Sequence, residues 1–127
     1  MERVGASAFE GTRLPRDGTW AVAFLADWCG FCREFVPDFE ALPLGAAHGL
    51  EVDISDLGNP LWELFEIDIV PTVLVFHERM QLARVDGVSG VGIDSCGLRR
   101  IEEILARIPS TLPGKPPRTS RRRPSGG

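Results

Sequence analysis

The 127-residue chain has few cysteines and no long apolar run. Three cysteines, an odd number, argue against a small secreted domain held together by disulfides. No stretch approaches the roughly 18 consecutive apolar residues of a membrane-spanning helix, so we expect no membrane span. Residues 1–15 have an acid at position 2 and no apolar stretch, which does not fit a secretory signal. We therefore expect a cytoplasmic protein, in which a close pair of cysteines binds metal or carries redox chemistry.

Composition and charge place most of the chain in one folded domain. Apolar residues make up 43% and charged residues 25%, which is ordinary for a globular domain and too apolar for a chain disordered throughout. Residues 1–108 carry all 18 acidic residues and a net charge of −9, while residues 109–127 carry +5 and no acidic residue. We expect one domain over residues 1–108.

Residues 109–127 form a proline-rich basic tail. Leu112 is its only large apolar residue, and it buries too little surface to offset the entropy lost on folding, so we predict a disordered tail. The consecutive Arg121, Arg122 and Arg123 are the kind of cluster that binds nucleic acid or another anionic surface. A tail that only aids solubility is the plainer interpretation, and we favour it.

The pattern of apolar residues predicts alternating strands and helices. Residues 20–26 are apolar throughout, as in a strand buried on both faces. The next segment has Phe35, Phe39 and Leu42 at helical spacing, in a helix that Pro37 should kink. The remaining predicted elements are a strand (50–54), a short helix (61–67), two strands (73–76 and 82–85) joined by a loop (77–81), a glycine-rich loop (87–97) and a helix (98–108). This order predicts an α/β fold with a parallel sheet and an antiparallel edge hairpin.

Two cysteines three residues apart lie where the first strand meets the first helix. Unpaired backbone N–H groups and the positive end of the helix dipole favour a thiolate at Cys29, so we expect its pKa below the ordinary value of about 8.5. Cys32 lies one turn further on and should stay a thiol. Cys29 can then attack a substrate disulfide, and Cys32 can resolve the mixed disulfide.

Two alternative roles of the cysteine pair stay open. A structural zinc site needs four ligands, and the remaining candidates, Cys96, His48 and His77, are isolated in the sequence. A purely structural cysteine pair is the second alternative. We expect no metal and no cofactor, and we interpret Cys96 as a free thiol beside the glycine-rich loop.

The segment around the pair resembles the active site of the thioredoxin family. Residues 26–33 are Ala-Asp-Trp-Cys-Gly-Phe-Cys-Arg, and the usual family motif is Trp-Cys-Gly-Pro-Cys. Pro37 matches the kink proline of the family, residues 70–72 (Val-Pro-Thr) match the segment with its cis-proline, and Gly87 matches the glycine that lines the substrate groove. The resemblance covers about residues 9–108 and implies a three-layer α/β/α sandwich with a mixed central sheet and an antiparallel C-terminal hairpin.

The resemblance also implies a substrate-binding surface around the Cys29 sulfur. A cis bond at Pro71 would turn the Val70 backbone outward, where an extended substrate strand could pair with it. An ordinary proline at the start of a strand is the alternative. The residues expected to ring the sulfur are Trp28, Gly30, Phe31, Val70, Pro71, Gly87 and Val88. Such a flat apolar surface suits the docking of protein chains better than the enclosure of a small molecule.

Two departures from the family affect its proton chemistry. The buried Asp of the family, six residues before the first cysteine, is Ala23 here, and the Lys usually paired with it aligns best with Glu51. We hypothesise that Glu51 reaches under the active site and acts as the proton shuttle, since burial raises a carboxyl pKa. The alternative is that Glu51 is a solvent-facing strand residue.

A third departure is Phe31, which stands between the two cysteines where the family has proline. Phe31 has an N–H group that proline lacks, and we expect this group to lie near Cys29 and stabilise its thiolate. We therefore expect a redox potential less reducing than the value of about −270 mV typical of thioredoxin.

The resemblance implies a thiol–disulfide oxidoreductase that reduces protein disulfides through Cys29 and Cys32 and takes its electrons from an unidentified reductase. The alternatives are a disulfide oxidase or isomerase, and a thioredoxin-fold adaptor or chaperone without catalysis. Only residues 2–4 are available for the first strand of the family, so we expect that edge of the sheet to be reduced or missing.

Overall fold

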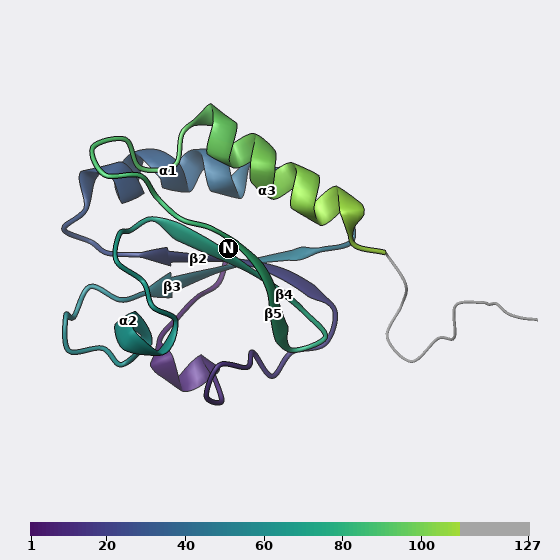
Figure 1. The fold of residues 1–127 in the computed structure, drawn as a ribbon, viewed down its shortest axis with the longest axis horizontal. Helices are drawn as coiled ribbons and strands as arrows, with labels where there is room; N and C mark the ends of the chain where they lie inside the picture. Colours follow the sequence, from purple (N-terminus) through teal and green to yellow (C-terminus); the bar gives the residue numbers. More distant parts are fainter. Residues whose placement is uncertain (110–127) are drawn as a thin grey trace, which may run out of the picture.

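The computed structural model describes residues 1–109, and the predictions made for the tail beyond them lie outside the described residues. Figure 1 shows a sheet with helices on both of its faces. The elements in chain order are β1 (Arg3–Val4), the 3₁₀ helix η1 (Ala6–Ala8), β2 (Thr19–Leu25), α1 (Gly30–Glu40), β3 (His48–Asp53), α2 (Leu61–Leu64), β4 (Thr72–His77), β5 (Met80–Val85) and α3 (Ser95–Arg107).

The five strands are arranged in the order β1-β3-β2-β4-β5. Strands β1, β3 and β2 run parallel, whereas β4 is antiparallel to both β2 and β5. In Figure 1 α1 and α3 cover the upper face of the sheet, and α2 and η1 lie below it. This arrangement is the predicted three-layer α/β/α sandwich, with a mixed sheet and an antiparallel C-terminal hairpin. None of the described helices is long and apolar enough to cross a membrane.

The central strands β2 and β4 carry the core because both of their faces are covered. Residues 21–25 and 72–76 are all buried, which explains why their apolar side chains do not alternate with polar ones. Below the sheet, the ring of Phe9 packs against Phe24 and Phe65, with centroids 5.9 and 5.2 Å away. These contacts fix the position of β2, and β2 in turn positions the cysteine segment that follows it.

Two helix boundaries differ from the prediction. Helix α3 begins at Ser95 instead of residue 98, because the Asp94 carboxylate caps it by accepting hydrogen bonds from the N–H groups of Cys96 and Gly97. Helix α2 ends at Leu64 instead of residue 67. The loop predicted for residues 87–97 is therefore shorter, and Cys96 lies on the first turn of a helix.

The edge strand agrees with the prediction, whereas the C-terminal hairpin differs from it in detail. Strand β1 has only two residues, so the edge of the sheet is reduced, as expected from the short N-terminus. The turn between β4 and β5 consists of Glu78 and Arg79, whose φ angles of 49° and 77° are in the left-handed region. A two-residue turn of this handedness matches the twist of the flanking strands, so the hairpin is tighter than the predicted loop of residues 77–81.

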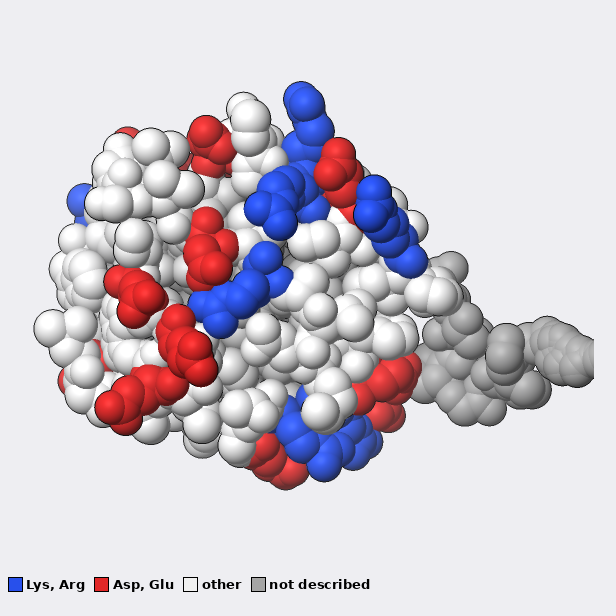
Figure 2. Space-filling model, viewed as in Figure 1, with Lys and Arg blue, Asp and Glu red and all other residues white. Residues whose placement is uncertain are grey.

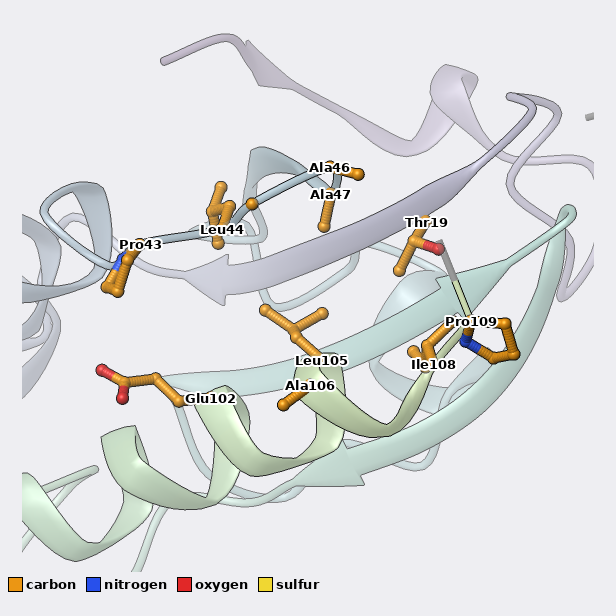
Figure 3. Close-up of a pocket in the computed structure, with 11 residues that line it drawn as sticks. Thr19, Pro43, Leu44, Ala46, Ala47, Glu102, Leu105, Ala106, Ile108 and Pro109 are labelled. Atoms are coloured by element: carbon orange, nitrogen blue, oxygen red, sulfur yellow. The ribbon is translucent and has the colours of Figure 1, made fainter. Parts of the chain in front are cut away.

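A hollow of about 290 Å³ lies between residues 43–47 and the last turns of α3 (Figure 3). Its lining is mostly apolar, with Thr19 and Glu102 as its polar side chains. Thr19 begins β2, whereas the cysteine pair follows the other end of that strand. The hollow is therefore separate from the site that contains the cysteines.

Candidate active site

The two cysteines lie at the start of α1, just beyond the carboxyl end of β2. Cys29 is the N-cap residue of α1, and its Sγ accepts a hydrogen bond from the Cys32 N–H at 3.2 Å. The Cys29 thiol donates to the Val70 carbonyl oxygen at 3.4 Å. Both thiols are free, with Cys29 8% exposed and Cys32 2% exposed. The Cys29 sulfur is therefore the one that an incoming disulfide can reach.

The Cys32 thiol is held in its protonated form. Burial raises the pKa of Cys32 to about 12, with a further contribution from the hydrogen bond to Cys29, while the positive charge of Arg3 acts in the opposite direction. A thiol with this pKa keeps its proton throughout the neutral range. Cys32 must therefore lose that proton before it can act as a nucleophile.

The segment around Pro71 forms the support beneath the Cys29 sulfur. The Val70–Pro71 peptide bond is cis. The Thr72 hydroxyl donates to the Ile69 carbonyl oxygen at 2.6 Å and accepts a hydrogen bond from the Gly87 N–H at 3.4 Å. Gly87 has no room for a side chain, because a Cβ there would lie 2.5 Å from the Pro71 carbonyl oxygen. The structure thus brings together Val70, Pro71 and Gly87, three of the predicted site residues.

Hydrogen bonds accepted by Ser55 hold the loop that precedes the cysteines. The Ser55 carbonyl oxygen accepts from the Trp28 indole N–H at 2.8 Å, and the Ser55 hydroxyl oxygen accepts from the Asp27 backbone N–H at 2.8 Å. That hydroxyl donates in turn to the Asp53 carboxylate. The network fixes Trp28 with its side chain 54% exposed at the surface, where the sequence analysis placed it.

Trp62 is a groove residue that the sequence analysis did not identify. Its ring stacks on that of Trp28, with the centroids 6.3 Å apart and the planes 8° from parallel. Its indole N–H donates to the Ile54 carbonyl oxygen at 3.0 Å, and part of the ring packs against the core. Nothing in the spacing of residues 28 and 62 indicates this stack, which depends on how the chain returns after β3.

An open groove of about 360 Å³ runs beside Cys29. Its lining is mostly apolar and consists of Trp28, Cys29, Gly30, Phe31, Trp62, Asp68, Ile69, Val70, Val88, Ser89 and Gly90. Five of these residues were predicted to ring the sulfur. Pro71 and Gly87 were also predicted there, but Pro71 is buried beneath the groove and Gly87 lies against it. Asp68, Ile69, Ser89 and Gly90 line the groove although no sequence pattern predicted them there.

Phe31 is placed differently from the expectation. The N–H group that reaches the Cys29 sulfur belongs to Cys32, and the described residues include no hydrogen bond from the Phe31 N–H to that sulfur. The Phe31 ring instead packs over Gly92, where a Cβ would lie only 2.9 Å from the Phe31 Cβ. The thiolate stabilisation expected from the Phe31 N–H therefore lacks a hydrogen bond, and the redox potential itself stays a prediction.

Glu51 is buried, so the interpretation of a solvent-facing residue is wrong. The residue is 2% exposed, and the register of β2 and β3 places it beside Ala23. Paired residues of neighbouring strands project from the same face of a sheet. The Glu51 carboxyl therefore leaves the sheet on the face from which an Asp at position 23 would project.

An ion pair joins Glu51 to the edge strand. The Arg3 guanidinium donates to Glu51 Oε1 at 2.9 Å, while Oε2 is buried without a hydrogen-bond partner among the described residues. Burial raises the pKa of Glu51, the Glu40 carboxyl raises it further, and Arg3 opposes both effects. The charge of Arg3 lowers the pKa values of both Glu51 and Cys32, against the effect of burial on each group.

Known proteins share this fold and sequence pattern. The family model described as Thioredoxin matches residues 3–93. A thioredoxin domain-containing protein of Theileria parva is 39% identical over 64 residues, which cover 48% of this chain and 29% of that protein. A thioredoxin of Chlamydia pneumoniae is 33% identical over 73 residues, which cover 56% of this chain and 71% of that protein. The solved structure of a mutant thioredoxin from Halobacterium salinarum NRC-1 has the same fold, with a TM-score of 0.63 at 20% identity over 88% of this chain and 95% of that one. The chain is a member of the thioredoxin family.

Proposed function

We propose that the protein reduces disulfides of partner proteins, with Cys29 as the nucleophile and Cys32 as the resolving cysteine. Membership of the thioredoxin family is consistent with thiol–disulfide oxidoreductase activity. The observation that carries the proposal is the difference between the two thiols. The Cys29 sulfur lines an open groove, whereas the Cys32 thiol is buried and protonated directly beside it.

The reaction consists of two exchanges. The Cys29 thiolate attacks one sulfur of the substrate disulfide, which forms a mixed disulfide and releases the other sulfur as a thiolate that takes up a proton. Cys32 then loses its proton and attacks the Cys29 sulfur, which releases the second substrate thiol and leaves a Cys29–Cys32 disulfide. Two electrons have passed to the substrate. A separate reductase, which we place with this protein in the cytoplasm, would return the pair to its dithiol form.

We further propose that Glu51 accepts the proton that Cys32 loses. A thiol with a pKa of about 12 needs a base for its second step, and Glu51 is a buried carboxyl on the sheet face that α1 covers. Its Oε2 atom carries no hydrogen bond among the described residues, so it is available to receive a proton. The pKa of Glu51 is raised toward neutral pH, and a group carries protons best when its pKa lies near the operating pH.

Insulin reduction by the full chain tests the proposed activity. With dithiothreitol as the electron source, we expect the chain to accelerate the precipitation of insulin chains. We expect the double variant Cys29→Ser, Cys32→Ser to return the rate to that of dithiothreitol alone. Full activity in the double variant would refute catalysis by the pair, and a chain that binds partners without any activity would be an adaptor or chaperone.

The redox potential separates reduction from oxidation or isomerisation. We expect equilibration with glutathione buffers to give a potential between about −270 and −220 mV, less reducing than thioredoxin but still low enough to favour transfer of electrons to protein disulfides in the cytosol. A value between about −180 and −120 mV, the range of isomerases and oxidases, would contradict the proposed direction.

Glu51→Gln should slow the second exchange and change its pH dependence. An amide cannot take the proton of Cys32, but water still can, so we expect release of the substrate thiol at pH 7 to slow about tenfold, less than the usual contribution of a general base. In the wild type the rate of this step should vary with pH as the Glu51 carboxyl titrates, and this variation should be absent in Glu51→Gln. Stopped-flow measurement of release from the mixed disulfide, across pH, provides the readout, with Glu34→Gln on the exposed side of α1 as the control.

The same variant should alter stability in a direction that the raised pKa determines. The folded pKa of Glu51 exceeds its unfolded value of 4.5, so the wild-type chain is most stabilised by this group below that pH, and the contribution is lost as pH rises through the folded pKa. Relative to the wild type, Glu51→Gln should therefore gain stability as pH rises above 4.5. Urea unfolding at several pH values measures this, and an identical pH dependence in the two proteins would contradict a raised pKa.

A further inference from the structure

Asp68 introduces a negative charge into an otherwise apolar groove. It lines the groove with Cys29 and Trp62, and it is exposed. Among the described residues its carboxylate forms no ion pair, whereas Arg33, the nearest cation in sequence to the cysteine pair, donates to the Asp27 backbone carbonyl oxygen at 3.0 Å. The Asp68 charge is therefore available to a group that enters the groove.

The surface next to Asp68 adds to this negative charge. Glu66, Asp68 and Asp86 line a neighbouring hollow, and Arg84 is the only cation among its lining residues. The Arg84 guanidinium is already bound to the Asp86 carboxylate at 2.7 Å and to the carbonyl oxygens of Phe65 and Glu66 at 2.8 and 3.2 Å. Arg84 thus compensates Asp86 and leaves Asp68 uncompensated.

The charge of the whole molecule acts in the same direction. Residues 1–108 carry a net charge of −9. Figure 2 shows acidic side chains gathered on the left of the molecule, at the end where β2 stops and α1 begins in Figure 1, while basic side chains lie mainly over α3 and along the lower edge. A field of this sign raises the encounter rate with positively charged partners and lowers it with negatively charged ones.

We propose that the groove selects disulfide segments in which a lysine or arginine lies within two residues of the cysteine that Cys29 attacks. The proposal rests on the proposed function and specifies its substrate class. A long cationic side chain fits this groove in two ways. Its methylene groups can pack on the stacked rings of Trp28 and Trp62, and its charge can reach both the indole faces and the Asp68 carboxylate.

The spacing of two residues follows from the position of Asp68 in the chain. Cys29 contacts the Val70 carbonyl, so the attacked substrate cysteine must lie next to Val70. A substrate strand that pairs with the Val70 backbone advances by about 3.3 Å per residue. Asp68 precedes Val70 by two positions, so it faces substrate residues about two positions from the attacked cysteine.

Activated peptides provide the test. Each peptide carries its target cysteine as a mixed disulfide with 5-thio-2-nitrobenzoate, whose release is followed by absorbance. Matched peptides differ only in a lysine or a glutamate two residues before, or in a second pair two residues after, that cysteine. The second-order rate constant with the prereduced full chain is measured for the wild type, Asp68→Asn, Asp68→Lys and the control Asp38→Lys. Asp38 is exposed on α1 away from the groove, and its variant makes the same change in net charge.

We expect the wild type to prefer lysine over glutamate about fivefold in at least one pair, as for an exposed ion pair. The preference should shrink between about 20 and 300 mM salt, fall in Asp68→Asn to the smaller part that the net charge supplies, and reverse in Asp68→Lys, with Asp38→Lys close to the wild type. Equal rates for both peptides in the wild type, or equal effects of the variants at positions 38 and 68, would overturn the proposal. A preference that changes with protein concentration would assign the groove to a second copy and would also overturn it. If no peptide reacts faster than with Cys29→Ser, Cys32→Ser, the proposed function itself fails.

Discussion

Cys32 is expected to react with iodoacetamide at pH 8 about a hundredfold more slowly than a cysteine in an unfolded peptide. With a pKa of about 12, the Cys32 thiolate is present at this pH at a fraction about three orders of magnitude below that of an ordinary thiol. The greater nucleophilicity of a more basic thiolate recovers part of this difference, and the 2% exposure of Cys32 removes more of it. Digestion and mass spectrometry at successive times give the extent of labelling at each cysteine.

The unfolded chain is the control for this measurement. In urea, burial no longer affects Cys32, so all three cysteines should be labelled at similar rates. Cys96 is exposed in the folded chain, so its labelling there shows that the reagent is active under the same conditions. Labelling of Cys32 as fast in the folded chain as in urea would show that its thiol is neither buried nor protonated as described, and the division of labour between the two cysteines would lose its basis.

Gly87→Ala is expected to lower the rate of disulfide reduction about a hundredfold. The new Cβ would lie 2.5 Å from the Pro71 carbonyl oxygen and 3.0 Å from the Ile69 Cγ2 atom, and a backbone oxygen cannot turn aside as a flexible side chain can. The segment beneath the groove must therefore shift relative to Cys29. A displacement of about 1 Å between reacting groups can cost about two orders of magnitude in rate.

Insulin reduction and thermal unfolding, measured on the same samples, separate a local shift from loss of the fold. Gly5→Ala is the matched control, because Gly5 has a φ of −120° and a Cβ there meets nothing within 4 Å. We expect Gly5→Ala to keep the wild-type rate, and Gly87→Ala to remain folded at the assay temperature with its melting point lowered. A folded Gly87→Ala protein with the wild-type rate would show that the support beneath the groove has no bearing on the reaction.

The sequence predicts the layers of the fold because apolar patterns report burial. Residues 20–26 are apolar throughout since β2 is covered on both faces, and the motif around Cys29 lies where a strand passes into a helix. Boundaries are less predictable. The cap at Asp94 begins α3 three residues earlier than its apolar stripe does, and a cap is a hydrogen bond of a single residue that periodicity does not report.

The candidate site was predictable where a motif is contiguous and unpredictable where the fold assembles it. Cys29, Phe31 and Pro71 follow from local patterns, whereas Trp62 and Asp68 join the groove through loops whose course no periodicity encodes. Glu51 is an intermediate case. Its burial depends on the register of β3 against β2, and a shift of one residue would turn its side chain to the other face.

The hydrogen bond from the Cys32 amide to the Cys29 sulfur links the redox state of the protein to the first turn of α1. A thiolate is a stronger acceptor than a thiol, and a sulfur in a disulfide is a weaker one than either. The chemical shift of the Cys32 amide proton is therefore a built-in spectroscopic reporter that changes at each stage of the cycle. An isotope-labelled sample would allow turnover to be followed at this one signal, with no dye attached to the protein.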